Sequence, residues 1–589
     1  MKSVTMASFV NKRLNVRNLD IHWLPHSVGC LISHAQTDDI INKNYQFNTP
    51  LYDPMEYSEY DDVLENTDIL CLTNYVWNQK YNDGISKYYK SLRSDGIVLY
   101  GGASVPEHHN YAQMYAQERP FVDLFFVGPG EITLTNFLKN IDTDIDSHRG
   151  TFGRGFNNVI VDKSTYSIAS ESIPDPYTSG IFDSIIDKIQ TKSLGITFES
   201  TRGCPFKCSF CDWGGLSRSL VSKLNQNQVF NTIDWIYANG DKIATVDIID
   251  ANFGMTSRDV EILDYFEELK QKTGHEFKIT VNGFVKNGSP YLKDTILKLN
   301  KLTGYSKNVM LSFQTHSEQA LKTIDRDNIR NEKFYPLIDE LHNEGLEIKS
   351  EMILGLPGET LEDYTRTLEI DYNLGMAGMR GYPLVFIVNT PMYATEYRQQ
   401  HGIKTKKIYI PHDLLLTRKQ YIFNTNRISN CDFTDEMQFE EVEVMYECNS
   451  FTNDELIEIL KRWWWYHNFY NLGTIRAEIA LLNSKGIGIK KQIEKFFNLL
   501  ESGELPVLKR IVNAYEKAIR EIYKPEPITM IRSADAVHFF QKGMRTYEPA
   551  YFIDNRELVQ SELEKIYTNV DSSHWTNRFA VTLDERIDD

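Results

Sequence analysis

Three cysteines within eight residues constrain this chain more than any other feature of its sequence. Cys204, Cys208 and Cys211 are spaced C-x3-C-x2-C, a pattern that chance gives in roughly one chain per thousand at this cysteine frequency. The triplet follows a predicted strand, Gly195–Ser200, so we expect it on a loop at that strand's C-terminal end. A structural zinc ion takes four protein ligands, usually as two pairs, and no second cysteine pair lies nearby. A cubane iron–sulfur cluster on three thiolates leaves one iron open to a substrate, and we favour it over zinc or buried structural thiols.

Short apolar runs alternate with helical stretches from residue 193 to residue 400, which is typical of α/β folds with parallel strands. One intervening helix, Arg258–Lys272, has a capping-box start at Thr256 and Asp259 and a stop at Gly274. The alternation predicts an open, partial (β/α)6 barrel of the TIM type, with its chemistry at the C-terminal strand ends. The six predicted strands are Gly195–Ser200, Thr245–Asp250, Phe277–Phe284, Val309–Thr315, Ile348–Gly355 and Pro383–Val388.

The first 145 residues show the same alternation on a smaller scale. We expect strands at Asp68–Tyr75, Gly96–Tyr100 and Asp123–Val127, a helix at Tyr81–Ser94, and an earlier strand and helix within Asn18–Ile32. This pattern predicts a doubly wound, Rossmann-like or flavodoxin-like domain. Ligands of such domains bind at the carboxyl edge of the sheet.

Two regions lack this alternation. Residues 146–192 are polar and turn-rich, and we interpret them as a linker over the surface. Residues 401–589 follow mostly helical patterns, interrupted by a β-type run at Phe439–Tyr446. Within this region, Trp463–Trp465 point about 100° apart on a helix, so we expect that they do not all face one core. Packing against neighbouring helices is the simpler interpretation, and one indole lining a substrate cavity or an interdomain face is the alternative.

Composition narrows the class of partner. The 589 residues carry a formal net charge of −18, which argues against a general nucleic-acid binder and favours a small-molecule or peptide substrate. No apolar run reaches membrane-spanning length, and Met1–Val16 lacks the apolar stretch of a signal peptide. We therefore expect a cytoplasmic protein without disulfides. Cys431 and Cys448 are too few for auxiliary clusters.

The segment Thr201-Arg-Gly-Cys-Pro-Phe-Lys-Cys-Ser-Phe-Cys-Asp-Trp-Gly-Gly215 closely resembles the signature of radical S-adenosylmethionine (SAM) enzymes, including an aromatic residue, Phe210, before the last cysteine. The resemblance implies a [4Fe-4S] cluster on Cys204, Cys208 and Cys211. Its open iron binds the amino and carboxylate groups of SAM, and an electron from the cluster cleaves SAM to methionine and a 5′-deoxyadenosyl radical. It also implies an electron donor such as flavodoxin or ferredoxin.

Other strand ends carry residues that fit the same resemblance. Gly355-Leu-Pro-Gly358 looks like the family's glycine–proline turn after the fifth strand, where glycine lets the backbone approach a ligand. The segment after the second strand holds the place of the motif for the methionine amino group, although it departs from the common Gly-Gly-Glu form. The resemblance implies that SAM is contacted by Phe210, Asp250, Asn252, Asn282, Gln314, Arg326, Glu351 and Gly355.

The N-terminal domain resembles the cobalamin-binding domain of one large radical SAM subclass, over roughly residues 18–140. A polar loop and two glycine-rich loops follow its predicted strands, and small residues there let a flat corrin ring lie against the backbone. Tyr75 or Val76 is the expected neighbour of cobalt. The implied cobalamin contacts are Thr73, Asn74, Tyr75, Val76, Gly101, Gly102, Gly128, Gly130 and Glu131.

One departure is informative. Many cobalamin proteins carry Asp-x-His-x-x-Gly, whose histidine ligates cobalt. This chain has only near misses around His22 and His148, which we interpret as structural or exposed residues. The radical subclass commonly lacks this ligand too, and an empty lower face favours low-valent cobalt, a strong methyl acceptor.

The resemblance leaves several functions open. The first is methylation of an unactivated carbon through methylcobalamin and a 5′-deoxyadenosyl radical. The second is a rearrangement or cyclisation that uses both cofactors without methyl transfer. Methylthiolating tRNA enzymes also place such a domain first but need three extra cluster cysteines, and only Cys30 and Cys71 are available here. A cobalamin-free flavodoxin-like domain and a non-catalytic sensor are the remaining alternatives.

Overall fold

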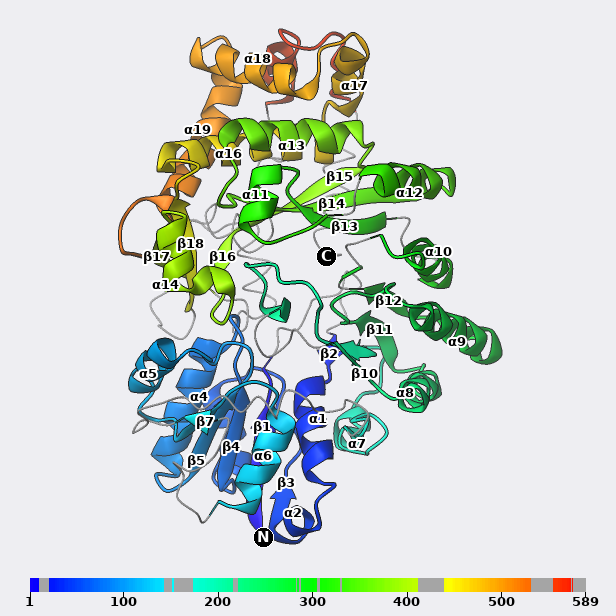
Figure 1. Cartoon of the computed structure of the whole chain (residues 1–589), viewed down its shortest axis with the longest axis vertical. Helices are drawn as coiled ribbons and strands as arrows, with labels where there is room; N and C mark the ends of the chain where they lie inside the picture. Colours follow the sequence, from blue (N-terminus) through cyan, green and yellow to red (C-terminus); the bar gives the residue numbers. More distant parts are fainter. Residues whose placement is uncertain are drawn as a thin grey trace.

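The structure is a computed structural model of the whole chain, in which an N-terminal α/β domain, a central barrel-like region and a C-terminal helical region follow one another (Figure 1). The central region lies between the other two (Figure 1). The structure describes residues 1–9, 21–141, 151–152, 173–214, 221–281, 283–284, 288–303, 308–328, 331–411, 439–530, 555–573 and 575.

The N-terminal domain is built on a six-stranded sheet with the order β3-β1-β4-β5-β6-β7. All pairs are parallel except β6 with β7. The three predicted strands are confirmed as β4, β5 and β6. The edge strand β7 extends this domain past the expected boundary at residue 145. The strands are β1 (Lys2–Ala7), β3 (Tyr45–Phe47), β4 (Ile69–Thr73), β5 (Ile97–Gly101), β6 (Leu124–Phe126) and β7 (Thr151–Phe152).

Helices cover both faces of this sheet, so the predicted doubly wound fold is confirmed (Figure 1). One face packs against α4 and α5. The other packs against α1, α2 and α6. The bounds are α1 (His26–Ala35), α2 (Asp39–Asn44), α4 (Gln79–Leu92), α5 (His109–Gln117) and α6 (Gly130–Lys139), and a short turn of helix, η1 (Tyr57–Tyr60) with α3 (Asp61–Leu64), precedes β4.

The expected strand within Asn18–Ile32 was assigned to the wrong sheet. The first strand of the N-terminal sheet is β1, at the start of the chain. The short strand β2 (His22–Trp23) instead pairs with β8 of the central region. The Trp23 indole fits there because Gly195 on β8 has no side chain to block it. The chain therefore contributes one strand, β2, to the central region before it forms most strands of the N-terminal sheet.

The central region contains two parallel sheets, with the orders β12-β11-β8-β2 and β13-β14-β15. Five of the six predicted strands are confirmed within a few residues. The sixth lies earlier than Pro383–Val388, because Pro383 ends β15 and the next residues join another sheet as β16 (Val385–Phe386). The strands are β8 (Leu194–Phe198), β11 (Ile243–Ile248), β12 (Lys278–Val281), β13 (Asn308–Gln314), β14 (Glu347–Leu354) and β15 (Gly378–Pro383).

Helices follow these strands on the outside of the region (Figure 1). The predicted capping box of α9 is confirmed, with Thr256 and Asp259 at its start and Gly274 in the left-handed conformation at its end. Helix α13 begins with the same arrangement at Thr360 and Asp363. The helices are α8 (Gln226–Ala238), α9 (Ser257–Thr273), α10 (Leu292–Thr303), α11 (Glu318–Thr323), α12 (Asn331–Asn343) and α13 (Leu361–Asn373).

The described end of the predicted linker is not a surface strap. Residues 173–192 include α7 (Asp183–Ile186), and their large side chains enter the core of the β8 sheet. Tyr177 and Phe182 are buried there, and the Tyr177 hydroxyl donates to the Thr197 carbonyl at 2.6 Å. Burial of two aromatic rings ties this segment to the barrel.

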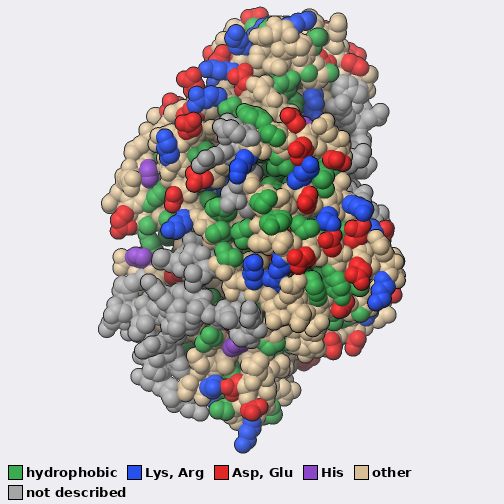
Figure 2. Space-filling model, turned by 45° about the vertical axis from the view of Figure 1, so that its right-hand side comes forward, with side chains coloured by type: hydrophobic (Ala, Val, Ile, Leu, Met, Phe, Trp, Pro, Cys, Tyr) green, Lys and Arg blue, Asp and Glu red, His purple; other side chains and the backbone are tan. Residues whose placement is uncertain are grey.

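The C-terminal region contains the predicted β-type run as β18, within a four-stranded sheet of order β16-β18-β17-β19. Apart from β17 and β19, which the sequence did not predict, the rest of its described part is mostly helical, as expected. Figure 2 shows a face of the molecule on which acidic and basic side chains are interspersed. The elements are α14 (Thr395–Gln400), β17 (Lys404–Pro411), β18 (Phe439–Glu447), α16 (Asn453–Trp465), a π-helical turn η9 (Tyr466–Asn471), α17 (Arg476–Ser484), α18 (Ile489–Glu501), α19 (Pro506–Tyr523), β19 (Ile528–Met530) and α22 (Arg556–Leu563).

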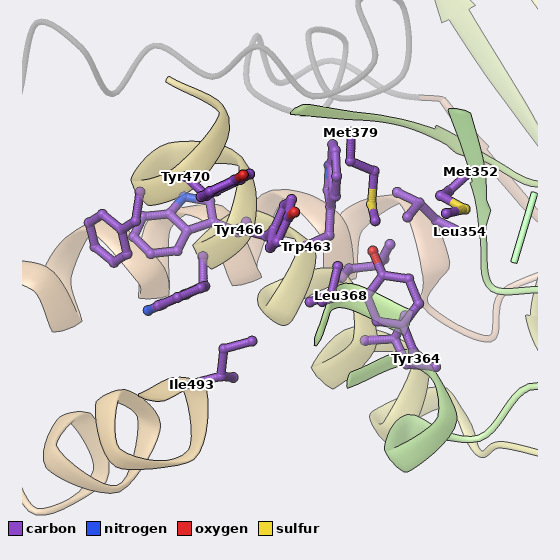
Figure 3. Packing of buried hydrophobic residues seen from close by; sticks show 14 of the residues in the cluster. Met352, Leu354, Tyr364, Leu368, Met379, Trp463, Tyr466, Tyr470 and Ile493 are labelled. Carbon is purple, nitrogen blue, oxygen red and sulfur yellow. The ribbon is translucent and has the colours of Figure 1, made fainter. Parts of the chain in front are cut away.

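The simpler interpretation of the three tryptophans, packing against neighbouring helices, is confirmed, whereas the expectation that they do not all face one core is wrong. Trp463, Trp464 and Trp465 are each at most 1% exposed and belong to one core cluster. The physical reason is that the C-terminal end of α16 is enclosed by protein on each of the sides that the three indoles face. Trp463 lies against the barrel strands at Gly381, whereas Trp464 packs against Phe496 of α18 and Tyr515 of α19. Figure 3 shows Trp463 beside Met379 and Leu354 of the strands.

Candidate functional site

The cysteine loop leaves the C-terminal end of β8, as the sequence predicted. The loop lies between β9 (Thr201–Arg202) and β10 (Ser222–Lys223), which pair with each other in antiparallel fashion. Gly203 then takes a φ of +90°, a conformation that favours glycine. Cys204 and Cys208 are buried, Cys211 is partly buried, and the Cys211 amide donates to the Cys208 carbonyl at 3.1 Å.

Two polar side chains from other strand ends contact the cysteine sulfurs. Asn252, after β11, donates through Nδ2 to Cys204 Sγ at 3.0 Å. Arg326, after α11, directs Nη1 at Cys208 Sγ at 3.7 Å. Burial lowers the pKa of the Arg326 guanidinium, and the three cysteine thiols each act to raise it. The Arg326 guanidinium therefore lies against Cys208, and the charges of the other two thiols also act on it.

This arrangement suits a cluster better than a single ion. Among the described residues no three His, Cys, Asp or Glu side chains are placed around one metal-ion position. A cubane binds each thiolate through a different iron, so its three sulfurs need not converge on a point. A buried guanidinium beside the sulfurs also compensates the negative charge that thiolate ligands bring.

Asn252 carries an acceptor suited to SAM. Its Oδ1 is buried with no hydrogen-bond partner, while its Nδ2 is held by Cys204. A buried amide oxygen without a partner costs free energy, and a ligand ammonium supplies the missing donor. Its neighbour Asp250 is engaged: both carboxylate oxygens accept from Ser200, one from the amide at 2.7 Å and one from the hydroxyl. Burial raises the pKa of Asp250 to about 7.

Three of the remaining predicted SAM residues, Gln314, Glu351 and Gly355, lie on or directly after β13 and β14. Gln314 ends β13 with a φ of +70°, which is uncommon for a residue other than glycine. Glu351 on β14 accepts from the Ser312 hydroxyl at 2.6 Å. Gly355 has a φ of +78° after β14, as the glycine–proline turn requires. Phe210 is partly buried against the central core, and Asn282 lies outside the described residues.

Glu359 is a polar residue of this edge that the sequence interpretation passed over. It follows the glycine–proline turn, is 0% exposed, and accepts from the Thr315 hydroxyl at 2.6 Å. Burial raises its pKa to about 8, and its Oε2 has no hydrogen-bond partner. Its position directly after Gly358 was the only signal available in the sequence.

The predicted corrin-binding loops all lie at the carboxyl edge of the N-terminal sheet. Thr73 and Gly101 are paired across β4 and β5. The loop after β4 is bonded to the loop after β5, since the Asn74 amide donates to the Gly101 carbonyl at 2.6 Å and the Ser104 amide donates to the Asn74 carbonyl at 3.0 Å. Gly102 has a φ of +100°, and a Cβ there would lie 2.7 Å from the Asn74 carbonyl oxygen.

Two features of this edge fit a large flat ligand with amide side chains. Asn74 is fully buried, and its Nδ2 has no hydrogen-bond partner. Tyr75 and Trp77 stack with ring centroids 4.6 Å apart, and Val76 and Trp77 are 37% and 40% exposed. Trp77 was not among the predicted contacts, and it gives the edge an apolar surface beside the predicted cobalt neighbours.

Glu131, a predicted corrin contact, pairs with a residue of the cysteine loop. Gly128 has a φ of +75° and Gly130 packs against Leu31, so this glycine turn directs α6 close to α1. Glu131, in the first turn of α6, is 5% exposed and pairs with Arg202 of the cysteine loop at 2.7 Å. Arg202 also pairs with Glu199 at 2.9 Å. The pair between Arg202 and Glu131 joins the two predicted cofactor edges.

The histidines of the near-miss cobalamin motif lie elsewhere. His22 is partly buried in β2, with its ring 6.3 Å from that of Tyr52. His148 lies outside the described residues. None of the described cysteines forms a disulfide, and no described helix has both the length and the apolarity needed to cross a membrane.

Comparisons with known proteins agree with this geometry. Residues 198–370 match the Radical SAM superfamily. The chain is 28% identical over 400 residues to the cobalamin-dependent radical SAM methyltransferase TokK of Streptomyces tokunonensis, a match that covers 66% of this chain and 57% of the relative. It is 26% identical over 432 residues to a 2-(S-pantetheinyl)-carbapenam-3-carboxylate methyltransferase of Streptantibioticus cattleyicolor, covering 70% of this chain and 62% of the relative.

The fold also has a solved counterpart. The cobalamin-dependent SAM radical enzyme OxsB, with aqua-cobalamin bound, is similar with a TM-score of 0.53 and 13% sequence identity, and the match covers 100% of this chain and 84% of that one. At this identity the likeness establishes the fold alone. The predicted order of a doubly wound domain, a barrel and a helical region is therefore that of a known architecture.

Proposed function

We propose, from the premise that the chain belongs to the radical SAM superfamily and is related to cobalamin-dependent members, that it is a C-methyltransferase using a [4Fe-4S] cluster, SAM and cobalamin. Its substrate in this proposal is a small molecule or a peptide with an unactivated carbon. The chain spans 57% and 62% of the length of the two methyltransferases reported above.

One observation carries the proposal. The cysteine loop of the barrel and the glycine-rich edge of the N-terminal sheet are tied together through Arg202 and Glu131. A cluster on the first and a corrin on the second would then face the same interior, which methyl transfer between them requires. A sheet edge that bound an unrelated ligand would have no need of this contact.

The chain's own residues divide the work. Cys204, Cys208 and Cys211 hold the cluster, and Arg326 places a buried positive charge beside their sulfurs. The Asn252 Oδ1 accepts from the amino group of SAM. Asn74 donates to the corrin, and Gly102 keeps the backbone close to it. When bound, the cluster and SAM supply a radical and cobalamin supplies the methyl group.

Two further assignments belong to the proposal. Reductive cleavage of SAM needs an electron, so we assign an external donor of the flavodoxin or ferredoxin type. Because such donors and SAM occur in the cytoplasm, we assign the enzyme to the cytoplasm. Gln314, the last residue of β13, and Glu351, within β14, remain predicted SAM contacts.

The test is anaerobic reconstitution with iron, sulfide and hydroxocobalamin, followed by metal analysis after desalting. About four irons and one cobalt per chain are expected. Cys208→Ala should lose the iron and keep the cobalt. Cys448→Ala is the matched control, because Cys448 is also buried but contacts Ser450 in the C-terminal region. Iron without cobalt in the wild type overturns the cobalamin assignment.

Product analysis then separates methyl transfer from the alternatives. With SAM and a chemical reductant, a methyltransferase yields S-adenosylhomocysteine as well as 5′-deoxyadenosine. A rearrangement or cyclisation yields only 5′-deoxyadenosine, and a sensor yields neither at a catalytic rate. Formation of 5′-deoxyadenosine alone by a cobalt-loaded chain therefore contradicts the methyltransferase proposal.

A further inference from the structure

A short segment after β16 touches both predicted cofactor edges. Residues 387–393 run from β16 to α14 and include the single-turn helix η6 (Pro391–Tyr393). The segment contacts the loop that follows Gly101 and Gly102 in the N-terminal domain, and it also contacts the cysteine loop. Its two contact points are three residues apart.

Asn389 makes the first contact with all of its side-chain polar atoms. Its Oδ1 accepts from the Glu107 amide at 2.7 Å. Its Nδ2 donates to the Ala103 carbonyl at 3.1 Å and to the Val105 carbonyl at 2.8 Å. One side chain thus closes three hydrogen bonds to backbone groups of a loop some 280 residues away in the sequence.

The loop that Asn389 holds is the predicted corrin loop. Its Ser104 amide donates to the Asn74 carbonyl at 3.0 Å, and its Val105 amide donates to the Gly102 carbonyl at 3.0 Å. Asn389 therefore fixes the backbone that carries Gly102 and that bonds to Asn74.

Met392 makes the second contact. Its amide donates to the carbonyl of Ser209, which lies between Cys208 and Cys211, at 2.8 Å. The Ser209 hydroxyl donates to Tyr397 at 3.2 Å. The backbone of the cysteine loop is thus fastened to the same segment that fastens the corrin loop.

The link between the two contact points is short and internally bonded. Thr390 closes a turn on Ile387 through both its amide and its hydroxyl, at 3.3 and 2.7 Å. The Tyr393 amide then donates to the Thr390 carbonyl at 3.0 Å. Pro391 fixes φ within this turn. A hydrogen-bonded turn that contains a proline has little conformational freedom, so it holds the two contact points at a fixed separation.

We propose that Asn389 is a positioning residue that sets the separation between the corrin edge and the cluster loop. It touches neither cofactor in this proposal and acts through the loop of residues 102–107. The inference rests on the proposed function for its catalytic consequence, whereas the contact itself can be tested without any cofactor.

Asparagine suits this position for two reasons. Asn389 has a φ of +74°, in the left-handed region that asparagine tolerates better than most residues. Its amide provides both the acceptor and the two donors that the three backbone groups need. Asn389→Asp would keep the acceptor but turn an oxygen toward the Ala103 and Val105 carbonyls. Asn389→Gly keeps the backbone conformation and removes only the side chain.

The first test is amide hydrogen exchange on the apo chain. In Asn389→Gly we expect exchange within residues 103–107 to quicken by about tenfold or more, because the Glu107 amide loses its acceptor and the loop its anchor. Exchange in the core strands β4 and β14 should stay unchanged. Unchanged protection within residues 103–107 overturns the inference whatever the cofactors do.

The second test uses the reconstituted enzyme. Spin–spin interaction between reduced cluster and cob(II)alamin, read by electron paramagnetic resonance, should weaken or broaden in Asn389→Gly. Formation of S-adenosylhomocysteine, which needs cobalt near SAM, should fall about tenfold, the effect of misplacing reacting groups. Formation of 5′-deoxyadenosine, which needs only the cluster, should stay within about twofold. An equal fall in both products overturns a positioning role.

A matched control comes from the same joint. The Tyr111 hydroxyl contacts the Tyr393 carbonyl at 3.4 Å and the Thr395 hydroxyl at 3.1 Å, beside the three Asn389 bonds. Tyr111→Phe removes these contacts and should leave the spin interaction and the product ratio as in the wild type. If the wild type binds no cobalt, the proposed function fails, and hydrogen exchange alone decides whether Asn389 anchors the loop.

Discussion

The carboxyl edge of the barrel and the carboxyl edge of the N-terminal sheet offer cofactors different kinds of contact. The barrel edge offers side chains: three thiols, the Arg326 guanidinium and the unpartnered Asn252 oxygen. The N-terminal edge offers mainly backbone, with glycines where the loops after β4 and β5 meet. Cofactor binding at the barrel edge should therefore be lost when side-chain atoms are removed. Binding at the N-terminal edge should be lost when a side chain is added.

This difference explains why the cluster site can be identified from the sequence, whereas the corrin site has no distinct sequence pattern. A metal cluster selects particular ligand atoms, so its cysteines and their spacing stand out. A corrin ring selects a flat surface and space, which many small residues can supply. The predictions that follow test this contrast from the largest expected effect to the smallest.

Replacing a cysteine should abolish one cofactor and spare the other. In Cys211→Ser the weaker oxygen ligand should cost the chain its iron, and SAM cleavage should fall by about a thousandfold or more, since the reaction has no other source of electrons. Cobalt content should stay at the wild-type level because Cys211 belongs to the cysteine loop and to none of the predicted corrin loops. Iron and cobalt measured together after desalting give the result.

If Cys211→Ser loses cobalt as well as iron, the two edges do not bind their cofactors independently. The cysteine loop would then be needed to shape the N-terminal edge, through Arg202 or through Met392. Reconstitution of the N-terminal edge with hydroxocobalamin before iron is added distinguishes this from a simple order of assembly.

Adding one methyl group at Gly102 should damage the other edge. The new Cβ would lie 2.7 Å from the Asn74 carbonyl oxygen and 2.8 Å from its nitrogen, at a φ of +100°. Strain and overpacking of this kind cost about 1–3 kcal/mol. We expect Gly102→Ala to bind hydroxocobalamin about tenfold more weakly and to retain its iron.

Gly101→Ala is the control for this substitution. Its Cβ would meet only the Phe126 Cβ at 3.7 Å, an ordinary contact. We expect cobalamin affinity close to that of the wild type, measured by titration of the visible spectrum. Equal losses of cobalamin affinity in the two variants would show that a side chain at any position on this edge blocks the ligand. The position next to Asn74 would then have no special role.

Much of the fold was predictable because buried parallel strands are continuous apolar runs. The strands β4, β5 and β8 could be located from their own residues. The sheet that β2 joins could not, because two residues carry no information about their partner strand. The burial of Trp463–Trp465 was also hidden, since it depends on α18 and α19 surrounding α16.

The candidate site shows the same limit. Cys204, Cys208 and Cys211 could be predicted from spacing alone. The role of Glu131 could not, because its charge is met by Arg202 from another domain. The contacts of Asn389 could not be predicted either, since its three partners lie at residues 103–107. Sequence patterns report local periodicity and ligand chemistry, and contacts between domains leave no trace in either.

A smaller effect is expected from Asn252, which separates cofactor binding from cluster assembly on the barrel edge. Asn252→Ala removes the acceptor assigned to the SAM amino group and the hydrogen bond to Cys204 Sγ. Loss of a hydrogen bond to a charged group costs about 1.5–3 kcal/mol, so the dissociation constant of SAM should rise roughly tenfold to a hundredfold. Iron content should be retained.

Asn252→Asp refines this result. The carboxylate still accepts from an ammonium but cannot donate to Cys204, and it places a negative charge beside a thiolate. SAM affinity should be closer to that of the wild type than in Asn252→Ala, while the cluster becomes easier to lose. Equilibrium binding of SAM to the reconstituted variants decides, and equal affinities in all three proteins refute the assignment.

The smallest effect concerns Glu359, a buried carboxyl on the barrel edge with a pKa raised by burial from 4.5 to about 8. Below pH 4.5 the folded and unfolded chains are both protonated here. Between pH 4.5 and 8 the folded chain keeps a proton that the unfolded chain has released, so rising pH lowers stability. The slope is at most about 1.4 kcal/mol per pH unit. Glu359→Gln removes this group from the titration.

The melting temperature of the apo chain should therefore fall less between pH 6 and pH 8 in Glu359→Gln than in the wild type, by roughly a few degrees. Glu362→Gln is the control, since its side chain is 76% exposed in the first turn of the following helix, α13, and should leave the profile unchanged. Identical profiles for the wild type and Glu359→Gln would mean that Glu359 is ionised with a compensating partner. The barrel edge would then hold its buried carboxylate by charge pairing, as the N-terminal edge holds Glu131 through Arg202.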